Sequence, residues 1–176
     1  AALSHNYHCI RRFLSPGCRY LAIVKADGYG HGAATVAGQL QKDGADWFGV
    51  ATMEEALDLR RQGIYRPILV LGYTDPAAAP ILASNTITQT LFSEEYALQL
   101  AAEAAKAGCV VDCHVKIDTG MSRLGFDAEN ENTVLMVEKL AQSGSLHITG
   151  IFTHFAVADE DTAVSMAFTE RQFTLF

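Results

Sequence analysis

The sequence of 176 residues is poor in basic side chains, with 13 lysines and arginines against 20 aspartates and glutamates and a net charge of −7. No segment gathers these cations into a basic stripe. Nucleic acids and anionic membranes bind clustered lysine and arginine, so we expect neither partner. No apolar run approaches the roughly 20 residues of a membrane-spanning helix, and no charged and then apolar leader opens the sequence. We therefore expect a cytoplasmic protein.

Cysteine is also scarce, and no C-x-x-C pair or metal-type spacing occurs. The four cysteines are Cys9, Cys18, Cys109 and Cys113. We interpret them as reduced thiols rather than as a disulfide framework or metal ligands. His5 and His8 lie one helical turn apart, a spacing that a metal pair also uses, but we interpret them as a solvated helix face. We predict no metal site.

Short apolar runs rich in valine, isoleucine and aromatic residues recur along the sequence, as is typical of strands buried on both faces. Longer stretches with helical signals separate them. The predicted strands lie within 20–24, 47–51, 67–72, 87–92, 110–117 and 148–155.

The helices are marked by capping residues. Thr52 and Glu55 have the spacing of a capping box, and Gly63 follows the helix that they open. Ser93 precedes a second helix with acidic residues in its first turn. Asp127 is predicted to cap a third helix, whose apolar residues lie on one face. That face comprises Val134, Val137 and Ala141.

The alternation of strand and helix predicts an α/β fold with parallel strands joined by right-handed crossovers, either a doubly wound sheet or a (β/α)8 TIM barrel. The segment "DGYGHG" that follows the first strand lacks the G-x-G-x-x-G spacing of dinucleotide-binding folds, which favours the barrel. About six of the eight βα units are present. Both ends of the sequence lie within amphipathic helices and it does not begin with Met, so we expect a segment of a longer chain with an incomplete barrel.

Polar residues follow several of the predicted strands, at the edge where such folds carry their chemistry. Lys25 ends the first apolar run. A lysine kept from water there becomes a nucleophilic amine suited to a Schiff base, although a lysine that only reaches water at a strand end has the same signature.

The other candidates each allow a structural interpretation as well. Tyr29, between glycines, could direct its hydroxyl at a phosphate, or "DGYGHG" is a plain turn. Arg123 offers a fork of donors for an anionic oxygen, or Asp118 forms a local ion pair with Lys116 or Arg123. His154 could stack on a flat cofactor or be a core histidine.

Three segments, "AIVKADGYGHGA", "HVKIDTGMSRLGF" and "GIFTHFAVAD", occur in this order and at separations that resemble the signature stretches of the alanine racemase family. The segments "FGVATMEEALDLRRQGI" and "PILVLG" are similar to the intervening units, so the resemblance covers essentially the whole chain. It implies a fold type III enzyme that uses pyridoxal 5′-phosphate (PLP).

The resemblance also implies roles for individual residues. Lys25 matches the lysine that binds PLP as a Schiff base and then acts as one of two acid–base catalysts. Tyr29 matches the tyrosine that binds the cofactor phosphate, and Arg123 the arginine that faces its phenolic oxygen. His154 matches the histidine beside the pyridine ring. Lys116 matches a lysine that is often carbamylated, a change that replaces repulsion of Arg123 by attraction.

The implied whole protein extends beyond these residues. Residues 1–176 match part of the N-terminal PLP-binding barrel domain, whereas the C-terminal β domain, which supplies the second catalytic base to a partner subunit, is absent from this chain. The implied enzyme is a homodimeric racemase that interconverts L- and D-alanine, with serine left open, and supplies D-alanine for peptidoglycan. The alternatives are a non-catalytic PLP-binding homeostasis protein with a single barrel and a type III decarboxylase, whose motifs match less well.

Overall fold

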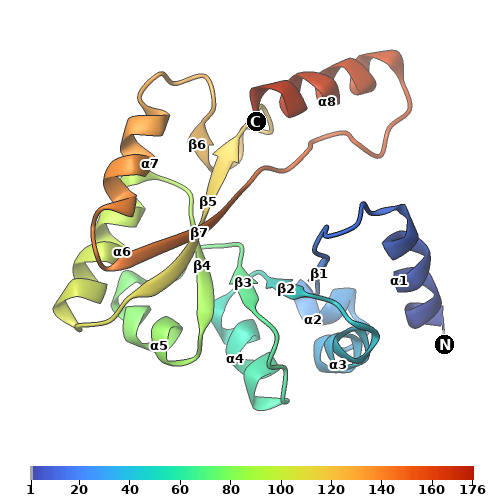
Figure 1. The fold of residues 1–176 in the computed structure, drawn as a ribbon, viewed down its shortest axis with the longest axis horizontal. Helices are drawn as coiled ribbons and strands as arrows, with labels where there is room; N and C mark the ends of the chain where they lie inside the picture. The colour runs from blue at the N-terminus through green and yellow to red at the C-terminus, as the bar shows by residue number, and fades with distance from the viewer. Residues whose placement is uncertain (1) are drawn as a thin grey trace. The chain divides into compact units, whose positions relative to one another are not determined.

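The computed structural model describes residues 2–176, which fold into two compact units. Unit 1 contains the chain up to Thr74 together with Ile81–Gln89, and unit 2 contains Asp75–Pro80 and Thr90–Phe176. Strands and helices alternate along the chain, and the strand pairs described within each unit are parallel (Figure 1). The predicted α/β class is confirmed, and these βα units are those of a partial (β/α)8 barrel. Among residues 2–176, no helix combines the length and apolar composition needed to cross a bilayer.

The strands of unit 1 pair in chain order. They are β1 (Leu21–Ile23), β2 (Trp47–Val50), β3 (Ile68–Val70) and the start of β4 (Ile87–Leu91). One row of register partners crosses all four strands and is almost completely buried. It consists of Ala22, Phe48, Ile68 and Ile87, none more than 4% exposed. Burying such a row removes apolar surface from water, which is the main stabilising contribution to this unit.

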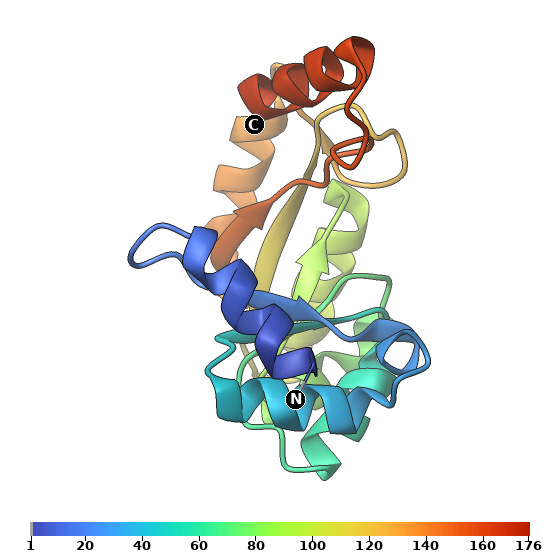
Figure 2. The ribbon, with the colours of Figure 1, turned by 90° about the vertical axis from the view of Figure 1, so that its right-hand side faces the viewer.

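Helix α1 (Ala2–Phe13) precedes β1, and the other helices of unit 1 follow its strands. They are α3 (Ala33–Asp43), α4 (Met53–Arg61) and, from Ile81 on, the short α5 (Ala79–Ser84). Helix α1 packs against α3, as Figure 2 shows. At α4 the Thr52 hydroxyl accepts a hydrogen bond from the Glu55 amide at 3.3 Å, and Gly63 follows the helix with a φ of 84°, so the predicted start and end are confirmed.

Arg60, in the last turn of α4, joins the two connections that precede β3 and β4. Its guanidinium donates to the carbonyls of Ile64 and Arg66, in the loop that leads to β3, at 2.8 Å each. It also donates to the carbonyls of Asn85 at 2.9 Å and Thr86 at 2.8 Å, in the turn before β4. Burial lowers the pKa of Arg60, but an arginine stays charged at any physiological pH. One side chain therefore satisfies four backbone acceptors from two connections.

Unit 2 is organised around β5, which pairs in parallel with both β6 and β7. The strands are β5 (Val111–Asp118), β6 (Phe126–Asp127) and β7 (Leu146–Phe152), and the helices are η1 (Pro76–Ala78), α6 (Glu94–Lys106), α7 (Thr133–Ala141) and α8 (Ala163–Leu175). Helices α6 and α7 lie side by side along β5 and β7 (Figure 1). Ser93 caps α6 as predicted, because its hydroxyl accepts from the Tyr96 amide at 3.2 Å.

The prediction for α7 is wrong in two respects. Asp127 does not cap it, since the helix begins at Thr133 and the Asp127 carboxylate closes a local turn by accepting from the Glu129 amide at 2.9 Å. The buried positions are Thr133 and Leu140, whereas Val134 is 65% exposed. An aspartate favours such short side-chain turns as readily as a helix cap, and the short β6 shifts the helix start along the chain.

Candidate active site

The segment that follows β1 in unit 1 is a left-handed turn, α2 (Lys25–Tyr29). Ala26, Asp27 and Tyr29 have φ values of 51°, 52° and 57°, and Gly28 has 62°. A left-handed conformation costs about 1–2 kcal/mol for each residue with a side chain, so the surrounding structure must hold this turn. Such strain is common at ligand sites.

Several contacts hold the turn. The Asp27 carboxylate accepts from the Ala33 amide at 2.8 Å, and its carbonyl accepts from the Gly32 amide at 2.9 Å. A Cβ on Gly28 would approach the Ala33 backbone to 3.3 Å, so glycine allows the turn to pack against the start of α3. The Glu55 carboxylate of α4 accepts from the Ala26 amide at 2.8 Å.

Lys25 and Tyr29 present their polar atoms from this turn. Lys25 is half-buried and follows the carboxyl end of β1, two residues after the strand ends at Ile23. Tyr29 is 63% exposed. Within residues 2–176, neither the Lys25 amine nor the Tyr29 hydroxyl has a hydrogen-bond or ion-pair partner.

In unit 2, the loop after β5 is organised by Asp118. One oxygen of its carboxylate accepts from the amides of Gly120 at 2.9 Å and Ser122 at 3.0 Å, and the other from the Arg123 amide at 3.2 Å. Burial raises the pKa of Asp118, but these amides and the charge of Lys116 together lower it by more, so it lies below its usual value. Within residues 2–176 Asp118 forms no ion pair, so the local ion pair considered from the sequence does not form.

Lys116 is the buried cation of this unit, with 4% of its surface exposed. Its amine donates to the Ile117 carbonyl at 2.7 Å and lies 5.9 Å from the centre of the Phe152 ring. Burial lowers the pKa of Lys116, Asp118 opposes this effect, and Arg123 lowers the pKa further. The structure thus brings Lys116 into the electrostatic field of Arg123, whose side chain is exposed.

His154 is exposed and follows β7 by two residues, in the segment held by Gln172 of α8. The Gln172 amide accepts from the Ala156 amide at 2.9 Å and donates to the His154 carbonyl and the Thr119 hydroxyl, each at 3.2 Å. Gln172 is completely buried and links the loops after β5 and β7. The His154 side chain is exposed in residues 2–176, and its role stays a prediction. Sequence reasoning also missed Gln172, which no local pattern marks.

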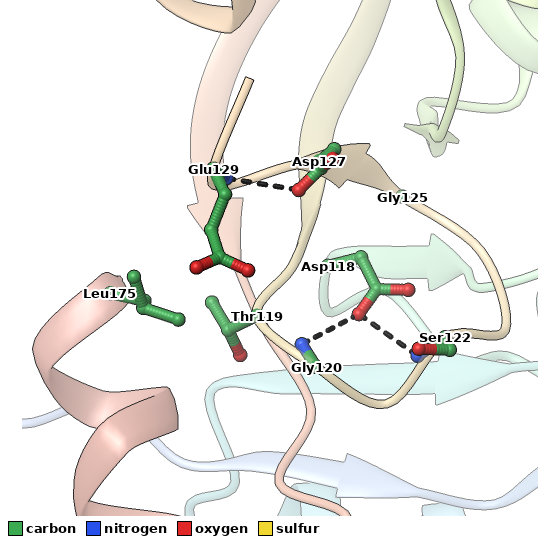
Figure 3. A pocket seen from close by; sticks show the side chains of 8 residues that line it. All are labelled: Asp118, Thr119, Gly120, Ser122, Gly125, Asp127, Glu129 and Leu175. Carbon is green, nitrogen blue, oxygen red and sulfur yellow. Dashed lines mark hydrogen bonds between the residues drawn. The ribbon is translucent and has the colours of Figure 1, made fainter. Parts of the chain in front are cut away.

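A pocket of about 340 Å³ lies beside the β5 loop (Figure 3). Its lining is acidic, with Asp118, Asp127 and Glu129 gathered around it, and Leu175 of α8 closes one side. None of the five predicted site residues lines it. Carboxylates repel a phosphate, so this pocket does not suit an anionic cofactor. In residues 2–176, no three His, Cys, Asp or Glu side chains are arranged to hold a metal ion.

Comparison with known proteins gives the family. The family model described as the N-terminal domain of alanine racemase matches residues 1–176. The chain belongs to the alanine racemase family. The resemblance of the three motifs is thereby confirmed.

Individual members of the alanine racemase family match closely. The alanine racemase of Desulfovibrio desulfuricans is 46% identical over 159 residues, which are 90% of this chain and 42% of that protein. The serine/alanine racemase of Enterococcus gallinarum is 39% identical over 175 residues, 99% of this chain and 24% of that protein. The solved alanine racemase of Clostridium difficile 630 has a TM-score of 0.90 at 37% identity, covering 98% of this chain and 45% of that one. The chain therefore spans less than half the length of these relatives.

Proposed function

We propose that the full-length protein containing this chain is a PLP-dependent racemase that interconverts L- and D-alanine by two-base proton transfer. Residues 1–176 form part of its N-terminal cofactor-binding barrel domain. The observation that carries the proposal is the Lys25 amine, half-buried and unpartnered within residues 2–176, on a strained turn at the carboxyl end of β1. An amine kept available at such an edge suits covalent attachment of an aldehyde.

The chemistry of the available donors fits PLP. The Lys25 amine would bind its aldehyde carbon, and the Tyr29 hydroxyl, on the same turn, would donate to its phosphate. Arg123, whose guanidinium has no hydrogen-bond partner within residues 2–176, would neutralise the phenolic oxygen, and the imidazole of His154 would lie beside the ring. Bound PLP supplies an electron sink that makes the Cα proton of an amino acid removable.

The residues of this chain then account for one half of the acid–base chemistry. Lys25 Nζ would remove the Cα proton on one face of the substrate and return it there in the reverse direction. A second base is required on the opposite face. We assign it to the tyrosine of the C-terminal β domain of the partner subunit, so the proposed active form is a homodimer. The proposed location is the cytoplasm.

Lys116 would be carbamylated in this site. Carbamylation requires an unprotonated amine, and the lowered pKa of Lys116 favours that form. The protonated amine would first lose one proton, and the neutral amine would then attack CO2 and release a second. The change from a cation to a carbamate anion therefore releases two protons. The product would attract Arg123 and help to hold its guanidinium in place.

Alanine is the proposed substrate and serine remains an option, because relatives include both alanine and serine/alanine racemases. The proposed physiological product is D-alanine for peptidoglycan. The choice between the two side chains is left to parts of the site outside this chain.

The test uses the full-length protein with PLP. Borohydride reduction followed by peptide mapping is expected to find a pyridoxyl group on Lys25, and chiral chromatography is expected to find D-alanine formed from L-alanine. Lys25→Ala should lose both signals, whereas Lys42→Ala, an exposed lysine on α3, should keep both. A label on Lys25 without D-alanine would instead support the PLP-binding homeostasis protein. Folded wild-type protein with no label would disprove the PLP assignment.

A further inference from the structure

Glu55 joins two segments that are far apart in the sequence. One oxygen of its carboxylate accepts from the Ala26 amide at 2.8 Å, and the other from the Ala51 amide at 2.7 Å. Ala51 directly follows β2, and Ala26 directly follows Lys25. We propose that Glu55 is the positioning residue for Lys25, holding the peptide group that follows it; this inference rests on the proposed function of Lys25.

The position of this contact in the turn matters most. Ala26 is the first of the left-handed residues, with a φ of 51°. The contacts of Asp27 with Gly32 and Ala33 hold only the later part of the turn. The Glu55 contact is the side-chain anchor at the point where the chain leaves Lys25. Without it, backbone hydrogen bonds from the Gly28 amide to Val24 and from the Gly30 amide to Ala26 would still restrain the turn. The peptide group after Lys25 would lose its side-chain restraint, and the direction of the Lys25 amine would be less fixed.

A carboxylate suits this role better than other side chains. Two amide donors converge on it, and an ionised carboxylate offers an acceptor oxygen to each in charge-assisted hydrogen bonds. A glutamine has one acceptor oxygen and directs an NH2 group at the second amide. The position in the first turn of α4 also favours the negative charge, because the amino end of a helix carries a partial positive charge.

Glu55 acts through the backbone and not on the reacting atoms. Within residues 2–176 no ion pair joins its carboxylate to the Lys25 amine. A change at Glu55 should therefore displace the base without removing it. Small displacements of a catalytic group lower the rate by roughly 10²-fold, while contacts that bind the ground state are changed less.

The experiment compares Glu55→Gln and Glu55→Asp in the full-length protein, with Glu54→Gln as the matched control. Glu54 is the preceding residue of the same helix turn, is exposed, and carries the same charge. Hydrogen exchange of peptides that cover residues 24–33, measured without PLP, is expected to be about tenfold faster or more in Glu55→Gln. With PLP and alanine, kcat should fall by roughly 10²-fold with KM little changed. Glu55→Asp keeps both acceptor oxygens on a shorter side chain. It should therefore restore part of the protection from exchange and part of kcat. Glu54→Gln should change neither.

The inference is overturned if folded Glu55→Gln exchanges in this segment at the wild-type rate, or if its kcat lies within twofold of that of Glu54→Gln. If Glu55→Gln does not fold, Glu55→Asp decides by the same two measurements. Failure of the proposed function looks different. Wild-type protein would then lack the borohydride label on Lys25, while hydrogen exchange without cofactor would still show whether Glu55 holds the turn.

Discussion

The loop after β1 and the loop after β5 both carry predicted site residues, but they are held in different ways. The β1 turn depends on a carboxylate from another element, Glu55, which lies 29 residues from Ala26. The β5 loop is held by Asp118, whose carboxylate bonds residues two to five positions further along the same loop. The Glu55 contacts require the fold to form, whereas the Asp118 contacts can form locally.

The two loops also differ in which substitutions should destabilise them. The conformational strain of the β1 turn lies in its left-handed residues, most of which still occupy an allowed region of backbone space. The β5 loop includes Gly120 and Gly125 at φ values of 130° and 129°, which side chains rarely adopt. The β5 loop should therefore tolerate substitution of its glycines less well than the β1 turn does.

The largest effect is expected for Gly125→Ala. Its Cβ would lie 2.7 Å from the Asp118 nitrogen and 3.0 Å from the Lys116 oxygen, and backbone atoms cannot move aside. The free energy of unfolding of the full-length protein should fall by more than about 3 kcal/mol, measured by urea denaturation. Gly120→Ala has the same φ but meets only the side chains of Phe168 and Gln172, so it should cost less. Equal losses would show that φ alone, and not the close contact, sets the cost.

A smaller loss is expected when the local anchor is removed. Asp118→Ala removes the acceptor for three amides and should cost about 2 kcal/mol, whereas Asp118→Asn keeps one acceptor oxygen and should cost about half as much. Hydrogen exchange of peptides covering 111–127 would report the opening of this loop. Both losses should stay within unit 2. Faster exchange in residues 24–33 would contradict the view that the loop is held locally.

In the β1 turn, Gly28→Ala should cost about 2 kcal/mol and Gly30→Ala about 1 kcal/mol. Both positions have positive φ, but the new methyl group meets the Ala33 backbone at 3.3 Å only at Gly28. Thermal unfolding of the two variants gives the comparison. If Gly30→Ala were the more damaging, the packing of the turn against α3 could not be what makes glycine necessary.

The smallest effect concerns pH. Because the folded pKa of Asp118 lies below its ordinary value of 3.8, its contribution is fully present above that value and is lost as the pH falls through the lower folded pKa. The stability difference between wild type and Asp118→Asn should therefore be constant from neutral pH to about 5 and shrink below about 4. Urea denaturation at several pH values measures it. A difference that grew on acidification would have the wrong sign for a depressed carboxyl pKa.

The sequence predicted most strands because buried parallel strands are continuous apolar runs, and each of the six expected runs overlaps a strand. The short β6 was not expected, and β7 begins at Leu146, before its predicted run. It also predicted the caps Thr52 and Ser93, whose signals are local. Lys25 and Lys116 stay predictions as site residues. It assigned Glu55 to a capping box, whereas the carboxylate bonds Ala26 and Ala51. Long-range contacts of this kind depend on strand order and register. The cap of α7 failed because Asp127 had a competing local turn.

Helix α4 is attached to the neighbouring loops at both ends, by the Glu55 carboxylate in its first turn and the Arg60 guanidinium in its last turn. Glu55 bonds amides beyond the carboxyl ends of β1 and β2, and Arg60 bonds carbonyls in the connections before β3 and β4. Between these two residues Ala56 and Leu59 are buried, so only the exposed face of the helix should be unconstrained. We expect substitutions at Glu54, Asp58 and Arg61, which face solvent, to be tolerated. A library randomised along α4 should keep a carboxylate and a guanidinium five residues apart while its exposed face diverges.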